Sequence, residues 1–371
     1  MLPKSRVIAA LEHRDVDRVP VGEIGVDYTI TERALGRETL YRAKWKEYQA
    51  YWEGRRDEIV ESYKRDIVAL ARAFEWDFVP APLVPPRRPS YEVPEFIDEY
   101  RWRYPDGSEW AFSPEIEGHA IRIKFPDMSV EDIPTPEPID ESQLEVAEHI
   151  VKELGGTHFI VGRPAVDGSF PYDESVGLQE FLMRMITQPD FVQRATEAYT
   201  ERSIIEQNAL LDVGCDAVLP GSDYCGTTGP MMSPAHFRQY VFPALKRLCD
   251  ETHARGRYLI KHTDGLTWKI MPMMIEAGID AWHGIQPSIG MDLAMLKEMY
   301  GDQICFFGGS DCDTLVAGTP GDAREEVRYA IQHAGQNGGL VITSSNTLMV
   351  GVKYENYLAV LEAIQEAGAG A

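Results

Sequence analysis

The residues most able to do chemistry are a histidine and an aspartate, His262 and Asp264, which follow a short apolar run. The segment from Tyr258 to Gly265 reads YLIKHTDG, a strand-like stretch that ends in a turn. Because successive side chains of a strand point to opposite faces, residues two apart can project the same way. A neutral imidazole beside a carboxylate can bind a metal, relay a proton or hold a polar substrate. The pair therefore predicts either a functional site or a histidine that its neighbour fixes structurally.

Polar residues also follow most of the other apolar runs in the chain. Aspartate, asparagine and serine end strands for local reasons, which explains many of these residues one at a time. That local reason does not explain the histidine or Arg163, so the set as a whole favours a shared site. The residues at these positions are Glu23, Asp27, Arg163, Asp167, Asp223, His262, Asp264, His283, Gln286, Asp311, Ser344 and Asn346.

Eight strand-like segments, each followed by helical sequence, can position these residues. Their apolar character is continuous rather than alternating, as in parallel strands that are buried on both faces. Eight β/α units in one chain predict a TIM barrel, in which catalytic groups lie on the loops after the strands. A doubly wound sheet is the alternative, because strand order cannot be read from sequence. The predicted strands are 18–25, 76–82, 158–164, 216–223, 258–265, 280–286, 303–311 and 339–346, and the predicted helices are 4–13, 55–74, 177–211, 234–255, 268–277, 293–300, 322–334 and 355–366.

Residues 83–157 interrupt this alternation between the second and third strands. Prolines crowd residues 85–94 and 134–138, and RWRYPDGSEWAF predicts a β-hairpin around its Pro-Asp-Gly turn. Connections of this length are usually functional or disordered, and the aromatic content favours order. The sequence thus predicts one barrel domain over residues 1–371, with an insertion that covers or narrows the site.

Composition excludes several classes of function. The chain has 59 Asp+Glu against 36 Lys+Arg, a formal net charge of -23, whereas binding to nucleic acid or an anionic membrane needs basic patches. No signal peptide is visible in the charged N-terminal segment, and no apolar run approaches the ~20 residues that span a bilayer. Five cysteines without CxxC spacing indicate a reducing compartment. These features predict a cytoplasmic enzyme and leave its oligomeric state open, a homo-oligomer included.

Several motifs together resemble the uroporphyrinogen decarboxylase superfamily. They are DRVPV near the start, SPAHFRQYVFPALKRL, IKHTDG, AGIDAWHGIQPSIGMDLAMLKEMYGD, FFGGSD and the closing YENYLAVLEA. The resemblance is strongest from about Asp216 to the end and weaker over residues 83–157. It implies a TIM barrel and one of two activities. These are decarboxylation of a tetrapyrrole without a cofactor, and zinc-dependent methyl transfer between small donors or thiols and a corrinoid protein.

The chain departs from both branches of the superfamily at the expected site. The decarboxylases carry an arginine-rich RQAGRY segment after the first strand, where this chain reads GEIGVDYTIT, and a histidine where alignment places Asn346. A polyanionic substrate facing Glu23 and Asp27 would be repelled. The thiol-directed zinc methyltransferases use His-x-Cys after the fifth strand and a cysteine after the eighth, where this chain has His262-x-Asp264 and again Asn346. Zinc accepts histidine and aspartate, and a site poor in thiolates suits an oxygen-bearing substrate.

The resemblance and these departures predict a methyltransferase that moves a methyl group from a small O- or N-methylated donor to a corrinoid protein. In this interpretation His262 and Asp264 hold a zinc ion or supply a proton. Asp223 is the third predicted catalytic residue, and Cys225 or Cys312 is a candidate to complete the ligand set, although buried cysteines are usually inert. The predicted substrate-binding residues are Arg163, Gln286, Asp311 and Asn346.

Two other functions remain open at this point. One is a decarboxylase of the same superfamily that acts on a smaller substrate. The other is a protein whose barrel binds a ligand without chemistry. No catalytic triad, P-loop or nucleotide-binding fingerprint is present to favour a further class.

Overall fold

The computed structural model describes residues 1–87, 93–116 and 118–369. Its main feature is a curled sheet of seven parallel strands in the order β1-β6-β7-β10-β11-β12-β13. Each follows helical sequence and pairs in parallel register with its neighbours. These strands are β1 (Phe78–Pro82), β6 (Phe159–Arg163), β7 (Ala217–Val218), β10 (Tyr258–His262), β11 (Ala281–His283), β12 (Cys305–Ser310) and β13 (Leu340–Ser344).

An eighth segment closes this sheet into the predicted TIM barrel. Val21 forms a parallel bridge to Ile342 of β13, and Gly22 forms one to Phe78 of β1. A Cβ at residue 22 would lie 2.5 Å from the Phe78 carbonyl oxygen and from its ring, so only glycine allows this approach. The barrel is therefore confirmed, but the predicted strand over 18–25 consists of isolated bridges.

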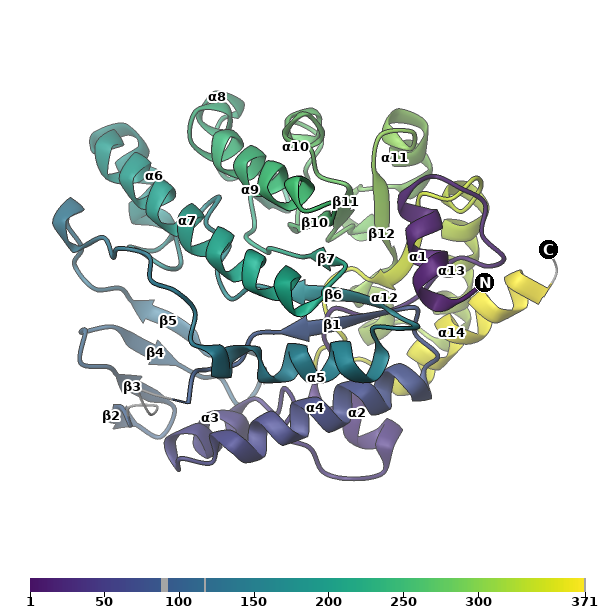
Figure 1. The fold of residues 1–371 in the computed structure, drawn as a ribbon, viewed down its shortest axis with the longest axis horizontal. Coiled ribbons are helices and arrows are strands. Elements are labelled where there is room, and N and C mark those ends of the chain that lie inside the picture. Colours follow the sequence, from purple (N-terminus) through teal and green to yellow (C-terminus); the bar gives the residue numbers. More distant parts are fainter. Residues whose placement is uncertain (88–92, 117, 370–371) are drawn as a thin grey trace.

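Helices cover the outside of the barrel, as Figure 1 shows, and no described helix is long and apolar enough to cross a membrane. The predicted helices are present, although residues 177–211 form two helices. No predicted helix covers α2, α3, α5 or α12. The helices are α1 (Pro3–Leu11), α2 (Tyr28–Leu35), α3 (Trp45–Trp52), α4 (Arg56–Ala73), α5 (Glu145–Leu154), α6 (Leu178–Thr187), α7 (Pro189–Val213), α8 (Pro234–His236), α9 (Phe242–Ala254), α10 (Met271–Ala277), α11 (Leu293–Tyr300), α12 (Cys312–Ala317), α13 (Pro320–Ala334) and α14 (Tyr354–Ala369).

The predicted helix 234–255 begins at Pro234, where Ser233 caps it, but it is not continuous. The Ser233 hydroxyl accepts a hydrogen bond from the His236 backbone N–H at 3.1 Å. A π-helical turn, Phe237–Val241, then separates α8 from α9. Pro243 follows this turn, and it lacks the N–H that an α-helix would direct to residue 239.

The insertion between β1 and β6 is an antiparallel sheet of four strands, which lies at the left in Figure 1. The predicted hairpin is confirmed as β3 and β4. Trp102 packs against Trp45 and Trp52 of α3, with ring centroids 5.8 Å and 5.1 Å apart, which fixes the sheet on that helix. The strands are β2 (Glu95–Asp98), β3 (Arg101–Arg103), β4 (Glu109–Ala111) and β5 (Ile121–Lys124).

The predicted limits of the insertion are too wide. Residues 145–154 form α5, which packs on α4, β1 and β6 and so belongs to the helical layer of the barrel. Part of the proline-rich run, residues 88–92, lies outside the described residues.

Apolar side chains fill one end of the barrel interior and form its inner core. Phe78, Phe159, Val161, Ile260 and Phe307 are among the residues that fill it, all of them fully buried. Helix α1 packs into the same cluster and covers the end opposite the insertion. Because side chains alternate along a strand, the residues two positions after this inner core point into the other end of the barrel.

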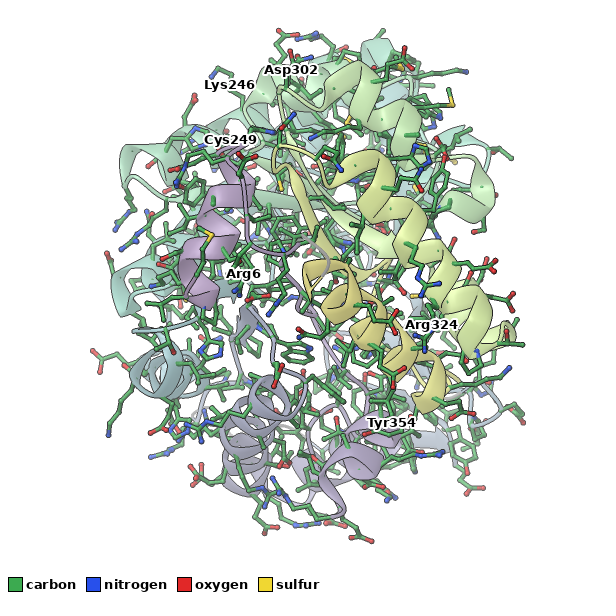
Figure 2. All side chains as sticks on the ribbon, turned by 90° about the vertical axis from the view of Figure 1, so that its right-hand side faces the viewer. Arg6, Lys246, Cys249, Asp302, Arg324 and Tyr354 are labelled. Atoms are coloured by element: carbon green, nitrogen blue, oxygen red, sulfur yellow. The ribbon has the colours of Figure 1, made fainter. Side chains whose placement is uncertain are left out.

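A buried carboxylate joins α1 to the barrel-closing segment, residues 21–25. Asp77 precedes β1 and is fully buried. It pairs with Arg6 of α1, which Figure 2 labels, and with Arg18 at 2.6 Å. It also accepts the Val21 backbone N–H at 2.9 Å. One carboxylate thus links α1, the barrel-closing segment and β1.

We expect Asp77→Ala to lower the free energy of unfolding by about 3–5 kcal/mol, because it removes the acidic partner of Arg18 and one of the two acidic partners of the buried Arg6. The matched control is Asp57→Ala. Asp57 pairs with Arg56 at 3.1 Å but its side chain is 70% exposed, so its loss should cost about 0–1 kcal/mol. Chemical denaturation of both variants measures the difference, and equal losses would contradict the role of Asp77.

Candidate functional site

Strand register places two histidines at the mouth of the barrel, the end opposite α1. His262 ends β10 and His283 ends β11, and the two residues are register partners. Ile260 and Ala281, two positions earlier, lie in the inner core, so alternation directs both imidazoles into the barrel. The loops that follow these strands carry most of the predicted site residues.

The structure brings Asp223, His262 and Asp264 together. His262 Nε2 lies 3.9 Å from Asp223 Oδ1 and 3.9 Å from Asp264 Oδ1. One ligand atom from each residue lies within 4.8 Å of the other two. The Asp264 backbone N–H donates to Asp223 Oδ1 at 2.8 Å, which ties the two loops to each other. The three predicted catalytic residues therefore form one cluster, and their catalytic roles stay a prediction.

A hydrogen bond holds the Asp264 carboxyl in one orientation and leaves one of its oxygens without a partner among the described residues. Asn346 Nδ2 donates to its Oδ2 at 2.7 Å, whereas its Oδ1 is buried without a hydrogen-bond partner among the described residues. Burial, together with the nearby Asp223 and Asp311, raises the pKa of Asp264 to about 7, although the hydrogen bond from Asn346 opposes the shift. The group can therefore hold or release a proton near neutral pH.

A glycine in the next loop makes room for this turn. Gly284 has a φ of 106°, and a Cβ there would lie 2.4 Å from the Thr263 carbonyl oxygen and 2.9 Å from Asp264 Oδ1. A larger residue would displace the carboxyl from its position beside His262.

The two histidines hydrogen-bond to each other through Nδ1 atoms 2.8 Å apart. Burial lowers the pKa of His262 to about 3 and that of His283 well below its usual range, so both rings are neutral at pH 7. One Nδ1 therefore donates and the other accepts. When His262 donates, its Nε2 offers a lone pair toward the two carboxylates, which is the tautomer that binds a metal. Sequence reasoning noted His283 at a strand end but could not pair it with His262 without the register.

The donor set of this cluster fits zinc. Zinc binds histidine nitrogen and carboxylate oxygen at about 2.0–2.2 Å, which puts tetrahedral ligand atoms about 3.4 Å apart. The 3.9 Å separations between His262 Nε2 and the two carboxylates need only small rotations to reach this value. A zinc ion would also satisfy the unpartnered Asp264 Oδ1. Three protein ligands leave a fourth position for substrate, as in catalytic zinc sites.

Arg163 and Gln286 also lie at the mouth. Arg163 follows the inner-core residues of β6, and its Nη1 donates to the Ile24 carbonyl oxygen at 2.7 Å. Gln286 Oε1 accepts the Gly265 backbone N–H at 2.9 Å, and its amide nitrogen has no partner within the described residues. Both side chains keep donors for a ligand, and their predicted substrate contacts stay predictions.

The prediction that Asp311 contacts substrate is wrong. Its carboxyl is 2% exposed and caps the start of α12. Its Oδ2 accepts the Ser288 N–H at 3.0 Å, and its Oδ1 accepts the Asp313 N–H at 3.2 Å and the Ser345 hydroxyl at 3.3 Å. Asp311 therefore fixes the loops around the cluster.

Cys225 and Cys312 do not complete the ligand set, because neither belongs to the cluster of described residues. Burial raises the pKa of each thiol to about 12, and zinc binds the thiolate form. Cys312 instead donates through its Sγ to the Thr347 carbonyl oxygen at 3.6 Å. Both are structural cysteines.

Glu23 and Asp27 do not present free negative charge to the mouth. Burial raises the pKa of Glu23 to about 8, and its Oε2 accepts the Ser344 hydroxyl at 2.5 Å. Asp27 is fully buried and pairs with Arg42 Nε at 2.8 Å and Lys44 Nζ at 2.6 Å. The interpretation that both residues repel an anionic substrate is therefore wrong, because the first is largely protonated and the second is neutralised.

Asp167, another polar residue after a predicted strand, has a structural partner. It forms a buried ion pair with Lys261, whose Nζ also lies 4.3 Å from the centre of the Tyr224 ring. Lys261 precedes His262, so strand alternation directs it away from the inside of the barrel. The pair joins β10 to the loop that follows β6.

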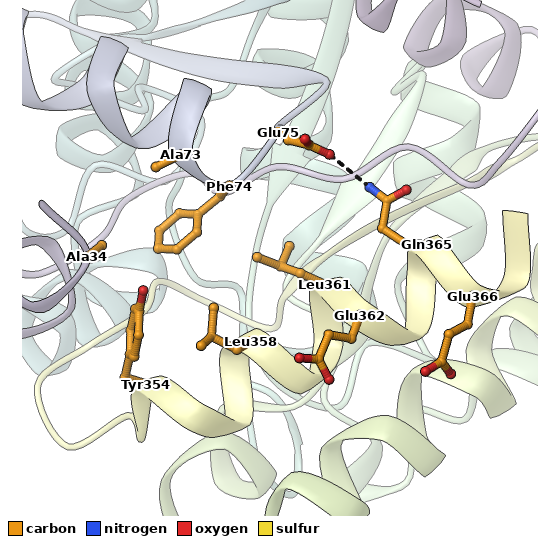
Figure 3. A pocket seen from close by; sticks show the side chains of 10 residues that line it. All are labelled: Ala34, Ala73, Phe74, Glu75, Tyr354, Leu358, Leu361, Glu362, Gln365 and Glu366. Atoms are coloured by element: carbon orange, nitrogen blue, oxygen red, sulfur yellow. Dashed lines mark hydrogen bonds between the residues drawn. The ribbon is translucent and has the colours of Figure 1, made fainter. Parts of the chain in front are cut away.

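A groove of about 540 Å³ lies outside the barrel, between the end of α4 and α14. Phe74, Tyr354 and Leu358 line its floor, and Gln365 Nε2 donates to Glu75 Oε2 at 3.3 Å across it (Figure 3). None of the predicted site residues lines this groove, so it is separate from the candidate site.

Comparison with known proteins identifies a family and a structural relative that covers the whole chain. The family model for uroporphyrinogen decarboxylase (URO-D) matches residues 125–367. A solved methyltransferase from Methanosarcina mazei is 19% identical, with 99% of each chain covered and a TM-score of 0.73. At that identity the likeness shows a shared fold.

Other solved structures resemble only part of the chain. A 3-keto-D-glucoside 4-epimerase from E. coli is 13% identical over 61% of this chain and 84% of its own, with a TM-score of 0.41. No match was found among curated proteins.

The metal prediction can be tested on the purified protein. Zinc reconstitution should give about one ion per chain, and His262→Ala should weaken zinc binding by at least ~100-fold, because even residues behind a ligand contribute 10- to 100-fold. His253→Ala is the matched control, since His253 is 40% exposed and pairs with Asp280 at 2.9 Å. Competition with a chromogenic chelator measures the affinities. Unchanged zinc binding in His262→Ala would reject the site.

The state of Glu23 predicts how stability depends on pH. Its folded pKa lies above its unfolded value, so the stability it contributes is complete below about pH 4.5 and is lost as pH rises toward 8. Relative to Glu23→Gln, the wild type should lose stability over this range with a slope approaching about 1.4 kcal/mol per pH unit. Denaturation of both proteins between pH 5 and 8 measures this difference. Parallel stability curves would mean that Glu23 is ionised throughout.

Proposed function

This chain belongs to the uroporphyrinogen decarboxylase family, and we propose that it is a methyltransferase that moves a methyl group from a small O- or N-methylated donor to a corrinoid protein. The observation that carries the proposal is the cluster of His262, Asp223 and Asp264, which combines a neutral imidazole with a carboxyl that titrates near pH 7. Its ligands are nitrogen and oxygen atoms, which suit an oxygen- or nitrogen-bearing substrate better than a thiol.

The chemical problem in this reaction is the leaving group. When a methyl group departs, the electron pair of the broken bond stays on an oxygen or nitrogen that is strongly basic. A proton supplied to that atom makes it a better leaving group. Asp264 is placed to supply it, because Oδ2 is held by Asn346 and Oδ1 remains free toward His262. Asp223 and Asn346 would orient the donor.

With zinc bound, His262, Asp223 and Asp264 would be its ligands, and the ion would supply Lewis acidity toward the methylated atom in place of the proton from Asp264. The corrinoid of the partner protein supplies the cobalt nucleophile. The barrel itself supplies position and electrostatics. An imidazole fixed by its bond to His283 cannot rotate away from the carboxylates, so the site is ordered before the donor binds.

A decarboxylase that acts on a smaller substrate is the second candidate. The observation that favours it is again the raised pKa of Asp264, since a carboxyl that is partly protonated at pH 7 can donate a proton to the carbanion left by loss of CO2. The two candidates differ in where the substrate bond breaks, so product analysis separates them.

The decisive assay combines the zinc-loaded protein, reduced cobalamin as acceptor, and a panel of methoxylated aromatics and methylamines. At least one donor should methylate the cobalt, visible as a change in its absorption spectrum. Asp264→Asn should lower kcat by about 10²–10⁴-fold, because asparagine can neither supply the proton nor ligate zinc as a carboxylate does. Asp250→Asn is the control, since Asp250 is 58% exposed on α9.

Uroporphyrinogen should not be turned over in the same preparation. Its efficient decarboxylation would overturn the methyltransferase assignment. CO2 release from a smaller carboxylic acid, without cobalt methylation, would establish the second candidate.

A further inference from the structure

The guanidinium of Arg163 lies at the mouth without an acidic partner among the described residues. Its one hydrogen bond goes from Nη1 to the Ile24 carbonyl oxygen, at 2.7 Å. Guanidinium carries five N–H donors, so most of its capacity is unused. Burial and the neighbouring Arg42 lower the pKa of Arg163 to about 10, which still leaves it charged at pH 7. A half-buried cation without an acidic partner is costly unless a ligand compensates it.

Two further cations stand beside it. Arg42 and Lys44 both pair with Asp27, at 2.8 Å and 2.6 Å, so two positive charges share one negative charge. His119 of the insertion lies on top of them, with its Nε2 3.1 Å from Arg42 Nη2 and 3.4 Å from Lys44 Nζ. Burial and the two cations lower the pKa of His119 to about 3, so it accepts from them as a neutral ring.

The backbone is strained where these two cations are attached. Arg42 has a φ of 49° and Lys44 a φ of 55°, a region that side chains other than glycine rarely adopt. Such conformations are energetically unfavourable and occur mainly where function requires them. Here they turn two long cationic side chains toward Asp27 and the mouth.

This cationic group lies next to the proposed catalytic cluster. Ile24, which accepts from Arg163, precedes Gly25. A Cβ at residue 25 would lie 3.2 Å from the Arg42 guanidinium and 3.1 Å from Thr347 Cγ2. Thr347 follows Asn346, whose amide bonds Asp264. Only Ile24 and Gly25 of the barrel-closing segment therefore separate Arg163 and Arg42 from the residues around Asp264.

We propose that Arg163, Arg42 and Lys44 form a subsite for a carboxylate on the methyl donor, so that the substrate is an anion whose methylated atom lies toward Asp264. This deepens the proposed function and rests on it. Arginine binds carboxylates through paired hydrogen bonds, which fixes the orientation of a planar group. The donors that fit are methoxylated aromatic acids and N-methylated amino acids.

A purely structural role does not account for Arg163. A neutral glutamine could donate one hydrogen bond to the Ile24 carbonyl oxygen. A cation placed beside Arg42, in a buried position, raises the free energy of the empty site through repulsion and desolvation. Both costs are repaid when an anion binds between them.

The test uses matched ligand pairs that differ only in charge. These are 3-methoxybenzoate with 3-methoxybenzamide, and N,N-dimethylglycine with its amide, each titrated calorimetrically into the zinc-loaded protein. In at least one pair the carboxylate should bind about 10- to 100-fold more tightly than the amide. Arg163→Gln keeps the bond to Ile24 and should bring the two affinities within about twofold of each other, with the amide unchanged.

Two further variants control the experiment. Arg163→Lys keeps the charge without the paired geometry and should retain part of the preference, which guards against a glutamine variant that does not fold. Arg328→Gln removes a surface arginine that is 56% exposed on α13 and should leave the preference intact. Equal affinities within every pair, no carboxylate binding at millimolar concentration, or a preference that survives Arg163→Gln would overturn the subsite. Arg163-dependent carboxylate binding without cobalt methylation would keep the subsite and reject the methyltransferase.

Discussion

Closure of the barrel by residues 21–25 is the constraint on which the rest of the structure depends. This segment bridges β13 on one side and β1 on the other, and the close contact of Gly22 with Phe78 leaves no room to shift its register. A fixed register determines what every following residue contacts. Glu23 bonds Ser344, the Ile24 carbonyl accepts from Arg163, and the Gly25 carbonyl accepts the Leu348 N–H at 3.0 Å.

These contacts connect closure to the candidate site. Glu23 holds the end of β13, from which Asn346 reaches Asp264. Trp76 donates to Tyr357 at 2.8 Å, and Tyr357 in turn contacts the Glu23 carboxyl, so the arrangement is anchored in the helical layer. A carboxyl buried this deeply is stable because it is protonated and bonded on both oxygens. The position of the Asp264 carboxyl therefore depends on the neutral carboxyl of Glu23.

The histidine pair illustrates the same principle in the centre of the mouth. His262 and His283 remain neutral because burial disfavours their charged forms, so His262 forms no strong ion pair with Asp223 or Asp264. Burial raises the pKa of Asp264, and repulsion between the two carboxyls adds to this rise. Either a proton or a cation relieves that repulsion. This is why one cluster can act as a proton donor or as a metal site.

Much of this arrangement could be predicted from sequence because it follows the strand period. Continuous apolar runs that end in polar residues predicted the barrel, and the spacing of His262 and Asp264 predicted that they share a face. The His262–His283 pair required the register of two strands, which no local pattern gives. Asp311 was misread because a residue that caps a helix and one that binds substrate occupy the same place after a strand.

Arg42, Lys44 and His119 were missed for a different physical reason. They come from a helix connection and an insertion, where no periodicity marks direction, and their orientation depends on packing. The aromatic contacts of Trp102 with α3 position the insertion over that connection. Only the folded chain brings these groups to Asp27.

The net charge of -23 misled the sequence argument about the mouth because charge acts locally. At physiological ionic strength the field of an exposed carboxylate decays over about 8 Å, so the many surface acids contribute little at the end of a barrel. Buried charges are screened far less. Arg42 and Lys44 carry two positive charges against the one negative charge of Asp27. Arg163 has no acidic partner among the described residues. An acidic protein can therefore carry a site that attracts anions, and the sign of such a site follows from its nearest buried groups.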